Sequence, residues 1–329
     1  MRRRDFIKVI AGSAAAWPLT ARAQQGERMQ RVGVFVALAA DDPETKAELA
    51  AFRQGLERLG WSEGHNLHID YRFAGGKPDR YASLTQELVA LKPDVLVAQG
   101  TPATAAMQAQ THSIPIVFSR VSDPVGSGFI ASLARPGGNV TGVLLYEQGI
   151  VSKWLAMLKE IAPHLTRVAL IANPSATPFD YFLRAAESAA PSLAIDLVPA
   201  PLNADTNVER MIEGFAAMPN GGLLFPPDAS ILSQRALIVT LAARYRLPAV
   251  YALRPFVDAG GLMSYSTDLS EVARLSATYV DRILRGAKPA ELPVQEPTKY
   301  ETVVNLKTAK TIGLDVPASL LVRADEVIE

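Results

Sequence analysis

The sequence predicts an α/β protein with two Rossmann-like, doubly wound lobes, each built on a parallel sheet and joined by three crossover segments. Short apolar runs alternate with amphipathic helical segments along nearly the whole chain, which is typical of parallel sheets. The chain of 329 residues is long for one domain, and its alternating pattern restarts after a Gly/Pro-rich passage at residues 134–142. A hydrophobic content of 49% with 20% charged residues suits a globular protein with a sizeable core.

The first half of the chain follows the pattern β-α-β-α-β-α-β. Leu67, Ile69 and Tyr71 alternate with polar residues, which predicts a strand with one wetter face near a sheet edge. The predicted strands are residues 32–36, 67–73, 95–98 and 114–118, and the helices between them begin near residues 44, 81 and 101.

The segment from Val95 to Asp123 is a complete βαβ unit. Gly100 ends an apolar strand, Thr101 occupies the expected helix N-cap, and Pro102 occupies the first helical position. Ser122 and Asp123 end the next strand. Because ligands bind at the carboxyl ends of parallel strands, we expect these residues on one ligand-binding rim.

The second half repeats the alternation after a first crossing between lobes at residues 140–145. The predicted strands are residues 168–171, 193–198, 223–225, 249–251 and 302–306, with helices near 154–161, 182–189, 208–215, 231–245, 269–283 and 307–312. Further crossings are expected at residues 261–264 and 289–297. Lobe 1 then comprises residues 27–142 with about 262–290, and lobe 2 comprises residues 143–261 with about 291–329.

Residues 1–23 are predicted to be a twin-arginine-type signal peptide. The stretch from Arg3 to Lys8 resembles a twin-arginine export motif, an apolar stretch follows, and Ala21-Arg22-Ala23 offers a cleavage site. The apolar stretch is well short of the ~20 residues that span a bilayer. We therefore expect an exported chain that begins near Gln24.

Composition excludes several functional classes. The absence of cysteine excludes disulfides, thiolate metal sites, a cysteine nucleophile and lipid attachment at an N-terminal cysteine. Removing the signal peptide takes five basic and one acidic side chain from 33 of each, which leaves a net charge of −4. A weakly acidic chain without a basic run is a poor candidate for binding nucleic acid.

Four predicted strand ends place a capping-type side chain beside proline at the start of a helix. They are Asp42-Pro43, Thr101-Pro102, Asn173-Pro174 and Pro226-Pro227-Asp228, two in each half of the chain. Helix N-termini carry free N–H groups and a partial positive charge, and they attract carboxylates and other anions. Proline after a cap is also common helix-starting chemistry that needs no ligand.

The candidate ligand-binding residues lie at or beside these strand ends. They are Ala40, Thr101, Pro102, Ala103, Thr104, Ser122, Asp123, Asn173, Ser175, Thr177, Asp228, Tyr251 and Tyr265. The first turn at Thr101–Thr104 is the expected carboxylate cradle, and Asp123 and Asp228 are the expected partners of a ligand ammonium. Tyr251 and Tyr265 are candidates for stacking on an apolar ligand side chain.

No catalytic or metal-binding residues are assigned, and no cofactor is expected. The sequence contains no G-x-S-x-G, Walker A or H-E-x-x-H motif, and its four histidines lack the spacing of metal ligands. An enzyme such as a racemase would need a paired acid and base in the cleft, and Asp123 with Asp228 is the one pair that could be placed there.

Three segments resemble one family. An export signal before two lobes with several crossings resembles a type I periplasmic binding protein. More narrowly, GTPATAAMQ, IPIVFSRVSDPVGSGFIASLARPGGNVTG and VVNLKTAKTIGLDVPASLLVRADEVIE are similar to segments of the ABC-importer substrate-binding components that include tryptophan- and tyrosine-type binding proteins. The resemblance covers essentially the whole mature chain.

The resemblance implies a monomer that clamps a small molecule, such as an amino acid or aromatic acid, by hinge closure and hands it to a membrane permease. Some family members are lipid-anchored through a cysteine, and this chain has none. The expected product is therefore soluble and periplasmic, and it is not an enzyme. A periplasmic sensor that reports to a membrane kinase remains an alternative with the same fold and site.

Overall fold

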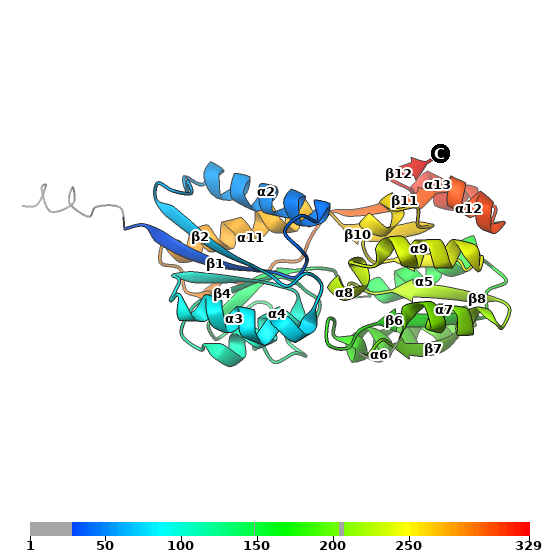
Figure 1. Cartoon of the computed structure of the whole chain (residues 1–329), viewed down its shortest axis with the longest axis horizontal. Helices are drawn as coiled ribbons and strands as arrows, with labels where there is room; N and C mark the ends of the chain where they lie inside the picture. The colour runs from blue at the N-terminus through cyan, green and yellow to red at the C-terminus, as the bar shows by residue number, and fades with distance from the viewer. Residues whose placement is uncertain (1–27, 148, 204–206) are drawn as a thin grey trace, which may run out of the picture.

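The structure is a computed structural model that describes residues 28–147, 149–203 and 207–329. Two α/β lobes lie end to end along the long axis of the molecule (Figure 1). This confirms the predicted fold class of two doubly wound lobes. The predicted signal peptide at residues 1–23 lies outside the described residues. Within the described ranges, every helix is too short or too polar to cross a membrane.

The first lobe contains a five-stranded parallel sheet in the order β2-β1-β3-β4-β5. Its strands are β1 (Gln30–Val36), β2 (Leu67–Phe73), β3 (Val95–Gln99), β4 (Ile116–Val121) and β5 (Val140–Leu144). Its helices are α2 (Pro43–Arg58), the 3₁₀ turn η1 (Pro78–Arg80), α3 (Tyr81–Ala90), α4 (Thr101–Gln110), and α11 (Leu269–Leu284), which returns from late in the chain. β2 lies at the sheet edge, as its alternating pattern predicts.

Apolar side chains cover both faces of the first sheet, which explains why the inner strand β3 is almost wholly apolar, whereas the edge strand β2 alternates with polar residues. Phe52 of α2 and Val280 of α11 belong to the cluster on one face, and Met107 of α4 belongs to the cluster on the other. Gly55 lets α2 and α11 approach closely, because a Cβ at this position would lie 2.9 Å from Ala277 Cβ.

The second lobe contains a seven-stranded sheet in the order β12-β11-β10-β9-β8-β6-β7. Its strands are β6 (Arg167–Ala172), β7 (Asp196–Pro201), β8 (Gly221–Phe225), β9 (Ala249–Tyr251), β10 (Met263–Thr267), β11 (Tyr300–Asn305) and β12 (Glu326–Ile328). Its helices are α5 (Ile150–Ile161), α6 (Phe179–Ala189), the 3₁₀ turn η2 (Ala190–Leu193), α7 (Val208–Ala216), α8 (Ala229–Leu232), α9 (Arg235–Arg244), α10 (Pro255–Asp258), α12 (Leu306–Ile312) and α13 (Ala318–Arg323).

This second sheet is parallel except where β11 pairs antiparallel with β10. The connection between the two strands explains the reversal. The chain leaves β10 for α11 in the first lobe and then returns to β11 from that lobe, so the two strands run in opposite directions. The expectation of a wholly parallel second sheet was therefore wrong at this pair.

Two of the predicted crossings fall on strands. Residues 140–145 largely form β5, the last strand of the first sheet, so the chain crosses after this segment. Residues 261–264 lead into β10, which belongs to the second sheet. The chain therefore returns to lobe 1 only at α11, later than residue 262, where the second segment of lobe 1 was predicted to begin. The local sequences of β5 and β10 do not indicate which sheet each strand joins.

The predicted third crossing at residues 289–297 starts inside lobe 1. Pro289–Glu291 forms the 3₁₀ turn η3, and Gln295 bridges Val143 of β5 before the chain reaches β11. Two smaller predictions were also wrong. The expected helix over residues 231–245 is divided into α8 and α9, and the expected strand over residues 193–198 begins only at Asp196 because η2 precedes it.

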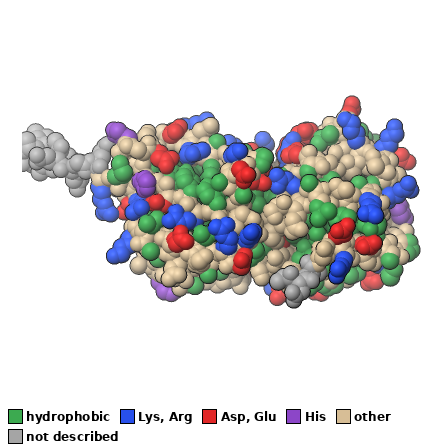
Figure 2. Space-filling model, viewed as in Figure 1, with side chains coloured by type: hydrophobic (Ala, Val, Ile, Leu, Met, Phe, Trp, Pro, Cys, Tyr) green, Lys and Arg blue, Asp and Glu red, His purple; other side chains and the backbone are tan. Residues whose placement is uncertain are grey.

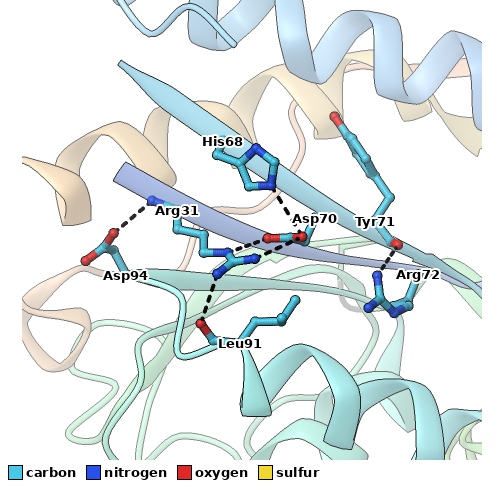
Figure 3. Close-up of polar contacts among 7 residues, drawn as sticks. All are labelled: Arg31, His68, Asp70, Tyr71, Arg72, Leu91 and Asp94. Atoms are coloured by element: carbon cyan, nitrogen blue, oxygen red, sulfur yellow. Dashed lines mark hydrogen bonds and ion pairs between the residues drawn. The ribbon is translucent and has the colours of Figure 1, made fainter. Parts of the chain in front are cut away.

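An ion-pair cluster ties the strands together at the amino ends of the first sheet (Figure 3). Arg31 Nε lies 2.6 Å from Asp70 Oδ2, and His68 Nε2 lies 3.4 Å from Asp70 Oδ1. Asp94 accepts the Arg31 backbone N–H at 2.8 Å. The hydrogen bond from Arg31 lowers the pKa of Asp70. This cluster lies at the opposite strand ends from the predicted ligand rim, and its geometry indicates a structural role.

Candidate functional site

A cavity between the two lobes lies where the predicted rim was expected. It measures about 440 Å³, including the part open to solvent. Lobe 1 contributes Ala37, Tyr81, Gln99, Gly100, Thr101, Pro102, Arg120, Ser122 and Leu145. Lobe 2 contributes Ala176, Thr177, Pro178, Pro227, Asp228 and Ala229. The lining combines a few polar groups with prolines, alanines and one tyrosine ring, which is the composition of a small-molecule site.

The N-terminus of α4 opens on this cavity. Gly100, and not Thr101 as predicted, is the cap residue, with φ = 85° and ψ = 165°. A positive φ favours glycine at the cap, and the helix begins at Thr101, one residue earlier than the predicted first position at Pro102. Thr101 Oγ1 is buried and has no hydrogen-bond partner among the described residues. Its hydroxyl and the free N–H groups of the first turn are therefore available to a ligand.

Two residues of the predicted cradle face the lobe interior. Ala103 is fully buried in the apolar cluster under α3 and α4. Thr104 is also fully buried, and its hydroxyl donates to the carbonyl of Gly100 at 2.9 Å. Both side chains point away from the cavity, so Thr101 and Pro102 are the residues of this turn that line it. The predicted ligand contacts of Ala103 and Thr104 are therefore not side-chain contacts in this arrangement.

Asp228 lines the cavity from lobe 2, but protein donors already occupy its carboxylate. One oxygen accepts from Ser230 N–H at 2.8 Å, Ser230 Oγ–H at 2.6 Å and Ile231 N–H at 3.1 Å. The other accepts from Asn173 N–H at 2.6 Å. Burial raises the pKa of Asp228, and these hydrogen bonds oppose that shift. Asp228 thus caps α8, and it can act on a ligand ammonium mainly through its charge.

The other predicted polar residues divide into two groups. Ser122 and Thr177 line the cavity. Asn173 uses its side-chain oxygen to accept the Ser175 N–H at 2.9 Å, and neither residue is part of the lining. Asp123 accepts the Gly126 N–H at 2.8 Å and lines a neighbouring hollow between the lobes, so it does not face the main cavity.

The two predicted stacking tyrosines and Ala40 lie outside the cavity. Tyr251 is fully buried and stacks on Phe225 and Phe256 in the core of lobe 2. Tyr265 stacks on Tyr300 in the second sheet, with its centroid 5.4 Å away. Ala40 is exposed in the loop before α2. Neither Tyr251 nor Tyr265 lines the cavity, because strand residues at an aromatic-rich sheet can point to either face.

Three polar side chains of the lining were not predicted. Tyr81, Gln99 and Arg120 all come from lobe 1. Arg120 Nη1 lies 2.6 Å from Glu48 Oε1, and Glu48 is only 3% exposed. One signal was available: Glu48 falls on the buried face of α2, where an unpaired carboxylate is costly and implies a cationic partner.

The lobes also touch beside the cavity. Arg235 Nη1 of lobe 2 lies 3.0 Å from Asp42 Oδ2 of lobe 1. Gly76 of lobe 1 approaches the start of α8 so closely that a Cβ there would lie 3.0 Å from the carbonyl oxygen of Ala229. Figure 1 shows α8 at the waist of the molecule, on the side of lobe 2 that faces lobe 1. The described conformation is therefore one in which the two rims are in contact.

The site offers no metal centre within the described residues, where no three His, Asp or Glu side chains gather as potential ligands. Lys, Arg, Asp and Glu side chains are interspersed over both lobes on the face shown in Figure 2. The chemistry of the cavity is therefore that of hydrogen bonds, one buried ion pair and apolar contact.

Comparison with known proteins gives a consistent result. A family model described as ABC transporter substrate binding protein matches residues 31–328. A tyrosine-binding protein of Clostridioides difficile strain R20291 is 24% identical over 281 residues, which cover 85% of this chain and 81% of that protein. The crystal structure of a conserved domain protein from Vibrio cholerae is 28% identical, with a TM-score of 0.85 over 91% of this chain and all of that chain.

Two further solved structures have the same fold. An ABC domain from Streptococcus pneumoniae in complex with L-Trp is 22% identical, with a TM-score of 0.84 over 91% of this chain and 99% of that chain. A Clostridium difficile substrate binding protein in a ligand-free, open structure is 23% identical and covers the same shares, with a TM-score of 0.66.

Proposed function

This chain belongs to the ABC transporter substrate-binding protein family, and on that premise we propose that it is the solute-binding component of an importer. In this proposal its two lobes close around a small ligand that carries a carboxylate, most simply an aromatic amino acid. The closed complex is then recognised by a permease in the inner membrane. The protein works as a monomer and performs no chemistry on the ligand.

The observation that carries this proposal is a cavity lined from both lobes, with an unpartnered hydroxyl at the N-terminus of a ten-residue helix. Thr101 Oγ1 and the first-turn N–H groups of α4 suit a carboxylate. Tyr81 and the prolines on both sides, Pro102 and Pro178, offer flat apolar contact to a ring. The names of a tyrosine-binding relative and an L-Trp complex support an aromatic amino acid.

Hinge closure is supported by the arrangement of the lobes. The chain is more similar to the L-Trp complex, at a TM-score of 0.84, than to the ligand-free, open structure, at 0.66. The contacts from Asp42 to Arg235 and from Gly76 to Ala229 would be lost on opening. A ligand that touches both rims stabilises the arrangement in which they meet.

Export to the periplasm is supported by the sequence of residues 1–23, with its paired arginines and A-x-A cleavage site. The proposed mature protein therefore acts in the periplasm.

Isothermal titration calorimetry tests the ligand class. We expect L-tryptophan or L-tyrosine to bind, while glucose and adenosine do not. Thr101→Val removes one hydroxyl at nearly constant volume, and we expect it to weaken binding by about tenfold, or about 1.4 kcal/mol. Thr104→Val is the matched control, because the Thr104 hydroxyl is bonded within the same helix. Binding of sugars alone would refute the carboxylate site.

The import role needs a second measurement. Ligand-loaded protein should stimulate ATP hydrolysis by its cognate permease–ATPase complex, and the ligand-free protein should not. A ligand-dependent change in the activity of a membrane kinase, without stimulation of ATP hydrolysis by the transporter, would favour the sensor role instead.

A further inference from the structure

Arg120 has an unusual backbone conformation at the edge of the cavity. Its φ is 68°, a left-handed value that side chains other than glycine rarely adopt. The pairing of β4 with β5 shifts register between Ser119 and Val121, so Arg120 is the extra residue of a bulge. Bulges and left-handed residues are concentrated at binding sites, where they redirect a side chain. Here the redirected side chain lines the cavity.

A chain of hydrogen bonds holds the Arg120 guanidinium from behind. Its Nη1 donates to Glu48 Oε1 at 2.6 Å, and Glu48 Oε2 accepts from Gln99 Nε2 at 3.1 Å. Gln99 Oε1 in turn accepts the Ala37 backbone N–H at 3.2 Å. Arg120 and Glu48 side chains are 11% and 3% exposed, so solvent competes little for these bonds. The network fixes one edge of the guanidinium.

The other edge remains available. Nε and Nη2 of Arg120 have no hydrogen-bond partner among the residues that the structure describes. Burial disfavours the cation, but the carboxylates of Glu48 and Glu44 outweigh this effect and raise the pKa of Arg120. The cavity therefore presents a charged guanidinium with two unused donor positions, beside the unpartnered hydroxyl of Thr101. A guanidinium edge of this kind matches a carboxylate.

We propose that Arg120 determines specificity by binding the carboxylate of the ligand, and that Glu48 and Gln99 are positioning residues that hold it. The inference rests on the proposed function, because it names a selecting group within the same cavity. It also specifies the charge of the ligand. Glu48 already balances Arg120, and Asp228 adds a negative charge on the opposite wall. A zwitterionic amino acid suits this distribution better than a dianion or an amine without a carboxylate.

The test compares ligands that differ only in the carboxylate. Binding of L-tyrosine and of tyramine, which lacks the carboxylate, is measured by calorimetry for the wild-type protein and for Arg120→Met. We expect the wild type to prefer L-tyrosine by at least 100-fold, and the variant to reduce this preference to less than 10-fold by weakening only L-tyrosine. Arg120→Lys retains the charge without the planar fork, so it should give an intermediate preference.

Arg120→Met leaves the buried carboxylate of Glu48 unpaired and can unfold the lobe. The double variant Arg120→Met with Glu48→Gln removes both charges together and keeps an amide that Gln99 can bond, so it provides the folded comparison. Glu48→Gln alone leaves the cation but loosens it. We expect it to lower the ratio of L-tyrosine to tyramine affinity by about tenfold, a readout that loss of stability alone does not change.

The outcomes separate this inference from the proposed function. A wild-type protein that binds no amino acid overturns both. A wild type that binds L-tyrosine, with variants that weaken L-tyrosine and tyramine equally, overturns only the role of Arg120 and leaves it a structural partner of Glu48. Collapse of the preference in Arg120→Met and in the double variant supports the assignment.

Discussion

A methyl group at residue 76 tests whether ligand binding requires the two lobes to meet. Gly76 has φ = 72°, and a Cβ there would lie 2.9 Å from Ser233 Oγ and 3.0 Å from the Ala229 carbonyl oxygen, both in lobe 2. Gly75 has φ = 67°, and a Cβ there would meet only Arg80 Nη1, at 3.9 Å. Gly76→Ala and Gly75→Ala therefore share the same backbone strain, but only the first puts a methyl group between the lobes.

The two variants should differ in ligand binding and not in folding stability. A left-handed alanine costs about 1–2 kcal/mol of unfolding free energy in either variant. Overpacking at residue 76 costs about 1–3 kcal/mol more, and only when the lobes are closed. The Ala229 carbonyl begins α8 and cannot turn aside as a flexible side chain could. If the ligand binds the closed form, this cost weakens binding by about 5–150-fold.

Calorimetry with L-tryptophan or L-tyrosine measures the affinity, thermal unfolding measures the stability, and small-angle X-ray scattering measures the radius of gyration with ligand present. We expect both variants to lower Tm by a similar amount, about 2–8 °C. Gly75→Ala should bind ligand as tightly as the wild type and show the same decrease in radius of gyration. Gly76→Ala should bind ligand weakly, and its radius of gyration should stay large when ligand is present. Equal affinities for the two variants would refute the reasoning that this contact belongs to the ligand-bound state.

Three further substitutions test other parts of the structure. Asp42→Asn keeps a capping side chain for α2 but removes the charge that faces Arg235. Calorimetry should show ligand binding weakened about fivefold, which corresponds to the loss of about 1 kcal/mol from this ion pair. Arg72→Met, the control, breaks an ion pair inside lobe 1 and should leave the ligand affinity unchanged. Burial and the neighbouring carboxylates raise the pKa of Glu44 from 4.5 to about 7, so its stabilising contribution is present below pH 4.5 and is lost as pH rises through 7. In urea titrations the free energy of unfolding of Glu44→Gln should therefore be about 2–3 kcal/mol higher than that of the wild type at pH 8, and the two should be equal at pH 4. Tyr251→Phe removes a buried hydroxyl without a partner among the described residues, so it should raise unfolding free energy by about 1 kcal/mol and leave ligand affinity unchanged; a tenfold loss of affinity would return this residue to the ligand site.

The fold was predictable because its signals are local. Apolar runs and helical periodicity identified β1 to β4 of the first lobe, but not β5, and the alternating pattern of β2 placed it correctly at the sheet edge. What failed was the assignment of segments to lobes. The local sequence of β10 does not identify its sheet, and only its pairing with β9 and β11 shows that it belongs to lobe 2. That information lies in contacts between distant segments, which periodicity does not contain.

The candidate site was predictable only in its position. Strand ends marked by Thr101, Ser122, Thr177 and Asp228 do meet at one cavity. Their chemistry was harder to predict, because a side chain that caps a helix already accepts hydrogen bonds from backbone N–H groups. Asp228 has the residue type expected of an ammonium partner, yet four protein donors surround its carboxylate. A side chain that caps a helix therefore has fewer positions left to hydrogen-bond a ligand.

Arg120 shows the converse. In sequence it is an arginine inside an apolar strand, and nothing nearby in the chain marks it as part of a site. Its placement depends on a bulge in β4 and on a carboxylate 72 residues away, Glu48, which lies on the buried face of α2. A buried charge must find its partner through the fold. Arg120, which has unused donors in the cavity, lies in a stretch whose local sequence predicts a core strand. Several residues whose local sequence predicts ligand binding instead cap helices.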